Sequence, residues 1–156
     1  MLHIKCNIFN MLNMQINKFT DLSLRVLMYV SHEDRTAVIT INEIAQQFNV
    51  QRNHLTKVIA RLSKEGWIIT TRGRTGGIKL AKPPKYLRLG DIIAQLEHGS
   101  LIDCSTPLCP IRGACNLKNI LDAGLKSFYL EMNRYSLADI LDSKTQQAVI
   151  KLHRSY

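Results

Sequence analysis

Three cysteines in the second half of the chain have residue types and a spacing suited to metal chemistry. Cys104, Cys109 and Cys115 are separated by four and five residues and lie within one stretch of twelve. Prolines and a glycine interrupt this stretch, which predicts an irregular loop over residues 98–115. Thiolates are soft ligands for zinc and for iron–sulfur clusters. The spacing therefore indicates three ligands that can converge on one point.

Three explanations of this cysteine cluster differ in their chemistry. The spacing departs from the C-x2-C pairs of common zinc ribbons, although zinc with a fourth ligand from elsewhere stays open. Disulfides are disfavoured in the cytosol and three cysteines would leave one unpaired, so a thiol switch is the weaker alternative. An iron–sulfur cluster is the preferred interpretation. The fourth cysteine, Cys6, lies far away in the sequence and is interpreted as unrelated.

The positive charge of the chain is concentrated in its first part. The net charge is +9, and residues 1–90 carry all of the excess, because residues 91–156 hold seven basic and seven acidic residues. Residues 50–90 contain ten basic residues and a single acid, Glu65. Such a distribution is typical of a surface that meets phosphate groups. A merely solvated basic face is the alternative.

Helical periodicity in the first half predicts a helix-turn-helix. The run after Thr20 and Asp21 predicts a first helix that one of these two residues caps. Thr40 and Glu43 have the spacing of a capping box, which predicts the start of a second helix. A third helix is predicted to follow directly and to end at Gly66. Two short amphipathic helices, the second of them polar and basic, are the sequence form of a helix-turn-helix.

A basic hairpin follows the predicted third helix. Residues 67–71 are aromatic and β-branched, a glycine-rich basic turn follows, and residues 78–82 alternate before two prolines. A helix over 89–97 then closes the domain. The fold class predicted is therefore mainly α with a small β-hairpin, as a winged helix-turn-helix DNA-binding domain over 14–97. A winged helix that binds protein instead is the alternative.

Candidate DNA contacts come from the third helix and from the hairpin. The start of a recognition helix usually reaches base edges, where Arg recognises guanine and Asn or Gln recognises adenine. Later basic residues suit phosphates, and the hairpin can enter the minor groove or hold the backbone. The predicted contacts are Gln51, Arg52, Asn53, His54, Lys57, Arg61, Arg72, Arg74 and Lys79.

A long helix after the cysteine loop is predicted to mediate dimerisation. Its apolar residues step by four and three, as in a coiled-coil seam: Leu121, Leu125, Phe128, Met132 and Tyr135. We expect a dimerisation helix with a C-terminal tail over 116–156, with packing on its own domain as the alternative. Residues 1–13 fit no pattern and are interpreted as an extension or a misassigned start.

The totals exclude several classes of protein. With 156 residues, of which 46% are hydrophobic, the chain can bury one core. No stretch approaches the roughly 20 apolar residues of a membrane span, and no export signal precedes the domain. We therefore expect a cytoplasmic protein. No nucleophile with a base and no nucleotide loop accompanies the cysteines, so an enzyme or electron carrier is disfavoured.

Four segments of the chain together resemble a known group of regulators. The run VQRNHLTKVIARLSKEGW, the wing TRGRTGGIKLAKP, the segment LGDIIAQLE and the three-cysteine loop are similar to nitric-oxide-sensitive repressors of the NsrR type. These belong to a wider winged-helix family that also contains the cluster regulator IscR. The IscR type carries a histidine ligand three residues after its last cysteine, where this chain has Lys118. That departure favours the NsrR type.

The resemblance implies a mechanism as well as a fold. It implies a homodimer with a 4Fe-4S cluster on Cys104, Cys109 and Cys115, although the residues alone leave a 2Fe-2S cluster open. It also implies a fourth ligand from the first helix of the other subunit, and Asp21 matches that position. The alternative role for Asp21 is a helix cap. The expected function is repression of operator DNA that nitric oxide relieves; an IscR-like redox or cluster sensor and a zinc-stabilised regulator or structural adaptor are the alternatives.

Overall fold

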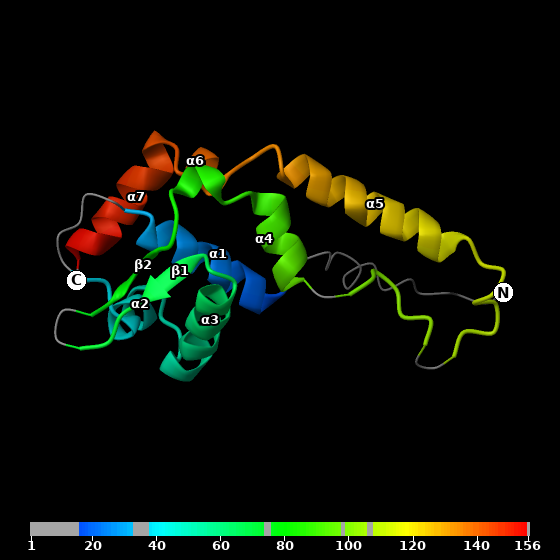
Figure 1. The fold of residues 1–156 in the computed structure, drawn as a ribbon, viewed down its shortest axis with the longest axis horizontal. Helices are drawn as coiled ribbons and strands as arrows, with labels where there is room; N and C mark the ends of the chain where they lie inside the picture. Colours follow the sequence, from blue (N-terminus) through cyan, green and yellow to red (C-terminus); the bar gives the residue numbers. More distant parts are fainter. Residues whose placement is uncertain (1–15, 33–37, 74–75, 98, 106–107, 156) are drawn as a thin grey trace, which may run out of the picture.

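The computed structural model describes residues 16–32, 38–73, 76–97, 99–105 and 108–155. Arg74, Cys6 and the predicted extension over 1–13 lie outside these ranges. The fold is mostly helical with one two-stranded antiparallel hairpin, as the sequence predicted. Figure 1 shows a compact body to which a long helix, α5, is attached at one side.

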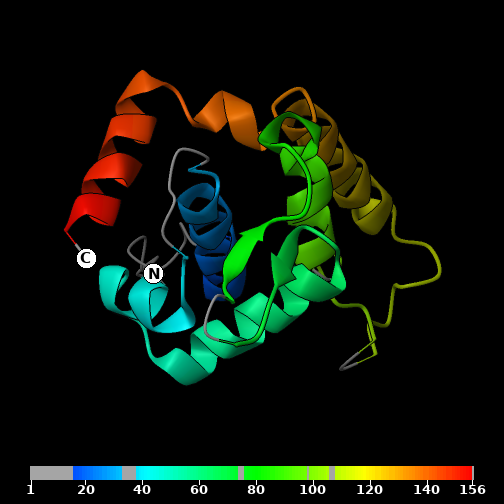
Figure 2. The same cartoon turned by 60° about the vertical axis from the view of Figure 1, so that its left-hand side comes forward.

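The core of the body is built around α1 (Lys18–Val30). Figure 2 shows this helix at the centre, with α2 (Ile41–Gln47) and α3 (Arg52–Lys64) on one side of it. The three helices meet through fully buried side chains such as Leu27, Ile44 and Leu55. Burial of each such side chain contributes about 1.5–3 kcal/mol. The helix-turn-helix is therefore held by a continuous apolar core.

The first helix begins earlier than the sequence indicated. Asn17 is its cap, and the Asn17 side chain accepts a hydrogen bond from the backbone N–H of Thr20 at 2.8 Å. The prediction that Thr20 or Asp21 caps this helix is therefore wrong. Three residues that can cap a helix lie close together here, and the spacing alone could not choose among them.

The ends of α2 and α3 follow the local rules that predicted them. The hydroxyl of Thr40 accepts from the backbone N–H of Glu43, and the Glu43 carboxylate accepts from the backbone N–H of Thr40. After α3, Gly66 has a φ of +70°, and the backbone N–H of Trp67 donates to the carbonyl of Leu62. This pattern is a Schellman motif, which requires a left-handed residue and so favours glycine.

The wing is a hairpin of β1 (Ile68–Thr70) and β2 (Ile78–Leu80), with Ile69 opposite Lys79. Ile39 adds a single bridge to Ile78, which draws the segment before α2 against the wing. A Cβ on Gly77 would lie 2.0 Å from a methyl of Val38 and 2.8 Å from the carbonyl of Ile39. Only glycine allows this approach, so Gly77 is explained by packing against the segment before α2.

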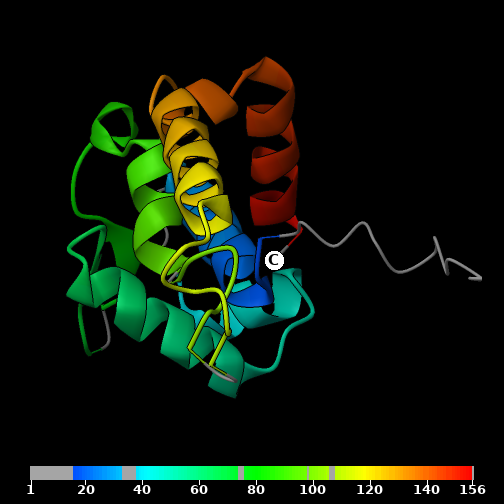
Figure 3. The ribbon, with the colours of Figure 1, turned by 90° about the vertical axis from the view of Figure 1, so that its right-hand side faces the viewer.

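Two helices connect the body to the cysteine loop: α4 (Leu89–Leu96) before it and α5 (Leu117–Met132) after it. They lie side by side in Figures 1 and 3. A Cβ on Gly90 would lie 2.1 Å from the carbonyl oxygen of Tyr129, so the LGD segment includes a glycine because the two backbones touch. The neighbouring Asp91 accepts a hydrogen bond from the Asn133 amide at 2.6 Å.

Two further helices lie beyond α5, where the sequence patterns predicted only a tail: α6 (Leu137–Ile140) and α7 (Ser143–Arg154). They bring the chain back over the body, and α7 ends beside α1 (Figure 2). Leu137 is fully buried, and Val149 is 7% exposed. Among the described residues, every helix is too short or too polar to span a membrane.

Candidate nucleic-acid interface and cysteine loop

The start of α3 presents a row of polar side chains to solvent. Gln51 precedes the helix as its cap residue and makes no capping hydrogen bond with its side chain. Arg52, Asn53 and His54 form the first turn, and all of them are exposed. Leu55 directly below them is fully buried. The core therefore fixes this helix while its first turn stays accessible, as reading of base edges requires.

The basic residues farther along α3 fall into two groups. Lys57 and Lys64 are exposed, and Lys57 can therefore serve as the phosphate contact that the sequence predicted. Arg61 is turned toward its own protein instead. Its guanidinium donates to the carbonyl of Gln95 at 2.8 Å, and its Nε lies 2.8 Å from the Glu65 carboxylate. Arg61 is therefore tied to α4 by contacts that the sequence did not indicate.

The wing carries two more of the predicted contacts. Arg72 follows β1 and Lys79 lies in β2, and both are exposed. Gly73, with a φ of +103°, begins the turn between them. The third predicted wing residue, Arg74, lies outside the described residues. The hairpin thus adds positive charge beside the recognition helix, where a DNA backbone would run.

The cysteine loop is irregular, as predicted, and the structure describes all three of its cysteines. Each has a free thiol and is partly exposed. The backbone N–H of Cys109 donates to the carbonyl of Cys104 at 3.3 Å, and that of Cys115 donates to the carbonyl of Ile111 at 2.9 Å. The loop is therefore a series of turns. Within the described ranges, no three His, Cys, Asp or Glu side chains come together as a metal site.

The donor set nevertheless fits an iron–sulfur cluster by its chemistry. Three thiols that are free and partly exposed are accessible to a metal, and cysteine sulfur is a soft ligand for iron. They lie on turns, which can adjust to a metal more easily than helices can. Lys118, where an IscR-type histidine would stand, is paired with Asp122 one helical turn along α5. A lysine in an ion pair adds no fourth ligand to the three thiols.

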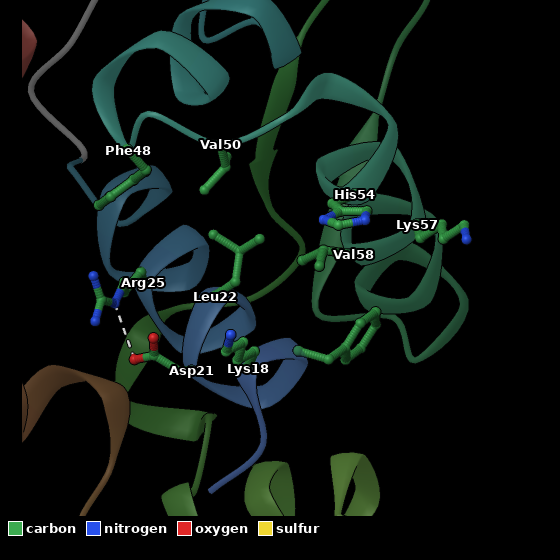
Figure 4. Close-up of a pocket in the computed structure, with 10 residues that line it drawn as sticks. Lys18, Asp21, Leu22, Arg25, Phe48, Val50, His54, Lys57 and Val58 are labelled. Atoms are coloured by element: carbon green, nitrogen blue, oxygen red, sulfur yellow. Dashed lines mark hydrogen bonds and ion pairs between the residues drawn. The ribbon is translucent and has the colours of Figure 1, made fainter.

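Asp21 lies in the first turn of α1, where its carboxylate is 2.9 Å from Nε of Arg25. Both side chains border a hollow of about 540 Å³ between α1 and α3 (Figure 4). His54 and Lys57 of the recognition helix border the same hollow from the other side. The predicted ligand therefore lies on the same surface as the predicted DNA contacts, with its carboxylate still accessible.

Buried polar contacts around Tyr29, which the sequence patterns did not indicate, join α1, α2 and α7. The Tyr29 hydroxyl of α1 donates to the Glu43 carboxylate of α2 at 2.6 Å. From α7, the ring of His153 stacks on Tyr29, with 4.0 Å between centroids, and its Nε2 lies 2.9 Å from the Tyr29 carbonyl. The sequence pattern indicates Glu43 only as part of a capping box. Only the tertiary fold shows that it also holds α1.

Comparison with solved structures identifies the fold. The chain is similar to IscR from T. potens, with a TM-score of 0.64 and 23% identity, over 85% of this chain and 89% of that one. It is similar to oxidized CymR from Staphylococcus aureus, with a TM-score of 0.62 and 21% identity, over 83% and 97% of the two chains. It is also similar to CymR of B. subtilis, the global cysteine regulator, with a TM-score of 0.52 and 20% identity, over 81% and 95%.

A family model matches most of the sequence. It describes the Rrf2 family, iron-dependent transcriptional regulators, and it matches residues 16–143. The match includes the helix-turn-helix, the wing, the cysteine loop and α5. The prediction that the protein is no enzyme is confirmed, because members of this family are regulators of transcription. By its fold and by its sequence, the chain belongs to the Rrf2 family of iron-dependent transcriptional regulators.

Proposed function

We propose that the protein is a transcription repressor that binds operator DNA as a homodimer loaded with an iron–sulfur cluster, and that nitric oxide releases it from the operator. The observation that carries this proposal is the combination of an exposed recognition helix with three free cysteines on one loop of an iron-dependent family. The proposed ligands are Cys104, Cys109 and Cys115, with Asp21 of the other subunit as the fourth ligand of a 4Fe-4S cluster.

The proposed DNA contacts divide by their chemistry. Gln51, Arg52, Asn53 and His54 are exposed at the start of α3 and are suited to bases. Lys57, Arg72 and Lys79 are exposed and are suited to phosphates. Arg74 is included by its place in the sequence of the wing. Sequence preference should depend on the first group, and salt-dependent affinity on the second.

The proposed homodimer is supported by the surface of α5. Leu117, Ile120 and Phe128 are exposed by 52%, 61% and 40%. At 100° per residue they fall within one stripe of the helix. The predicted seam shares Phe128 with this stripe, and its members Leu121 and Leu125 are half-buried. An apolar stripe on a long helix is suited to pairing with a second copy, and such a pair would set the spacing of two recognition helices.

The cluster would supply a reactive iron, and the chain would control access to it. A carboxylate is a weaker iron ligand than a thiolate, so an Asp21 ligand would leave one iron open to a small molecule. Asp21 would leave its contact with Arg25 to bind there. Loss of that ligand would loosen the link between the subunits. A change of 1.4 kcal/mol in this preorganisation alters operator affinity tenfold.

Metal analysis and operator binding of a cysteine variant test this function. We expect the protein purified without oxygen to contain iron and acid-labile sulfide, and the variant Cys109→Ala to lose both while staying folded. Operator affinity should fall at least tenfold in that variant. Cys6→Ala is the control and should keep iron, sulfide and affinity. Zinc without sulfide would contradict the proposal and favour a zinc-stabilised regulator, and thiol oxidation without metal would favour a thiol switch.

A further inference from the structure

The last turn of α4 contacts the end of α3 and the cap of α1, directly before the cysteine loop begins. Gln95 contacts Arg61 of the recognition helix through its carbonyl, at 2.8 Å. Glu97, the residue that ends α4, accepts a hydrogen bond from the backbone N–H of Asn17, the cap of α1, at 2.7 Å. The pKa of Tyr129 in α5 is raised, mainly by burial and secondly by the negative charge of Glu97. Glu97 therefore also lies near α5.

The contact from Arg61 is chemically specific. The carbonyl of Gln95 is among the last four of α4, which have no partner within the helix and carry its negative partial charge. A guanidinium satisfies such a group well. Nε of the same planar guanidinium fork lies 2.8 Å from the Glu65 carboxylate, so one side chain connects α4 to the end of α3. The Arg61 side chain is only 28% exposed.

We infer that the last turn of α4 transmits the state of the cysteine loop to the recognition helix, and that Arg61 is the positioning residue that receives it. This inference rests on the proposed function and goes beyond it, because the sequence assigned Arg61 to a phosphate. The cysteine loop follows α4 directly, so a change in the loop moves Gln95 and Glu97 first. Arg61 then shifts α3, whose exposed first turn lies two helical turns away.

The two roles for Arg61 make different predictions for a lysine substitution. A phosphate contact needs only positive charge, which Arg61→Lys retains. Transmission needs a fork that holds Gln95 and Glu65 together, which a lysine cannot form. We therefore test Arg61→Lys in two backgrounds, the cluster-loaded protein and the cluster-free variant Cys109→Ala. Lys57→Ala is the control, since Lys57 lies on the same helix and is exposed.

We expect Cys109→Ala to lower operator affinity at least tenfold when Arg61 is present, and less than threefold when it is replaced by lysine. The slope of the logarithm of affinity against the logarithm of salt concentration should stay unchanged in Arg61→Lys. The magnitude of this slope should fall by roughly 0.9 in Lys57→Ala, in both backgrounds. Without DNA, cluster loading should slow hydrogen exchange of the last α3 amides in the parent protein, and this protection should disappear in Arg61→Lys.

One result would overturn the inference. If Cys109→Ala lowers affinity by the same factor with arginine and with lysine at position 61, the effects of the two substitutions are independent. The signal then does not pass through Arg61, and its contact with Gln95 has only a structural role. If the proposed function itself is wrong, the result is different. Cys109→Ala then leaves operator affinity unchanged even in the protein that retains Arg61.

Discussion

The winged-helix body and the segment made of the cysteine loop and α5 differ in how much of their apolar surface they bury. In the body, α3 buries four large side chains, among them Leu55 and Leu62 at 0% exposure. Among the described residues, α5 buries none fully, and the loop exposes Leu108 and Ile111. The body is therefore specified by its own core. The loop and α5 leave apolar surface and thiols for something outside the chain.

This difference explains why the two regions suit different tasks. Base recognition needs a rigid helix, and α3 is fixed by contacts on the side that faces α1 and the wing. Sensing needs a segment whose conformation depends on what is bound to it. The loop has turns and few contacts of its own, so a bound group can change it at little energetic cost. The contrast can be tested by matched changes in the two regions.

The largest expected effect is loss of a core side chain in the body. Leu62→Ala should lower the free energy of unfolding by about 3 kcal/mol, because the side chain is fully buried and its removal leaves a cavity. The matched change in α5, Ile120→Ala, should alter it by less than about 0.5 kcal/mol in the monomer. Urea unfolding at low protein concentration measures both. Equal losses would show that α5 is part of the core.

Ile120→Ala should act instead on association. If α5 pairs with a second copy, the substitution should raise the dimer dissociation constant roughly tenfold, or about 1.4 kcal/mol. Sedimentation equilibrium measures this constant. An unchanged value would remove the exposed stripe of α5 from the proposed interface.

The next effect concerns the contact that joins the two regions. Gly90→Ala should destabilise the protein by about 2 kcal/mol, because its Cβ would overlap the backbone of Tyr129 and the side chain of Asn133. Gly113→Ala in the cysteine loop is the control, since an added Cβ meets nothing within 4 Å there. Thermal unfolding compares them. Similar melting temperatures for the two variants would contradict the close packing of α4 on α5.

Smaller effects are expected for the proposed DNA contacts. Arg52→Ala should cost about 1–2 kcal/mol at the operator and relax base preference, whereas Lys57→Ala should weaken binding to all sequences and flatten its salt dependence. Fluorescence anisotropy with operator and scrambled DNA separates the two. Neither variant should alter the visible spectrum of the protein. Identical behaviour of both would count against the division into base and phosphate contacts.

The smallest expected effect is a response of α7 to acid. Hydrogen bonds from the backbone and side chain of Thr145 hold the pKa of Asp142 below its ordinary value. The folded state therefore gains stability from this cap above the ordinary pKa, and the gain is lost as the pH falls below about 4. Hydrogen exchange of the first amides of α7, measured as a function of pH, detects this loss of stability. Asp142→Asn should keep the cap and remove this dependence; a dependence that persists would point to another group.

Local rules predicted the elements whose signals lie within a few residues. The capping box at Thr40, the left-handed Gly66 and the hairpin all follow from short-range chemistry. The predicted start of α1 was wrong because Asn17, Thr20 and Asp21 can each cap a helix. The two last helices were missed because α7 buries little apolar surface and is held partly by His153, whose partners lie more than a hundred residues away.

The candidate site was predictable in its residue types but not in its connections. Exposure of Asn53 and Lys57 follows from the helical period once Leu55 is assigned to the core. The direction of Arg61 does not, because a basic residue at the flank of a helix can reach outward or back to its own protein. The contact with Gln95 spans 34 residues, and no pattern along the chain encodes it. The three thiols are close in sequence, but their spacing alone does not fix their arrangement.

In the proposed function, the cysteine loop holds a cluster whose reaction with nitric oxide controls DNA binding. The most direct test is a stepwise nitric oxide titration of the protein purified without oxygen, with the visible spectrum and operator binding followed on the same sample. We expect a brown protein whose colour bleaches or shifts in proportion to added nitric oxide, with operator release at the same ratio. A protein that stays colourless after anaerobic reconstitution with iron and sulfide, or that holds the operator unchanged after its colour is lost, would contradict it.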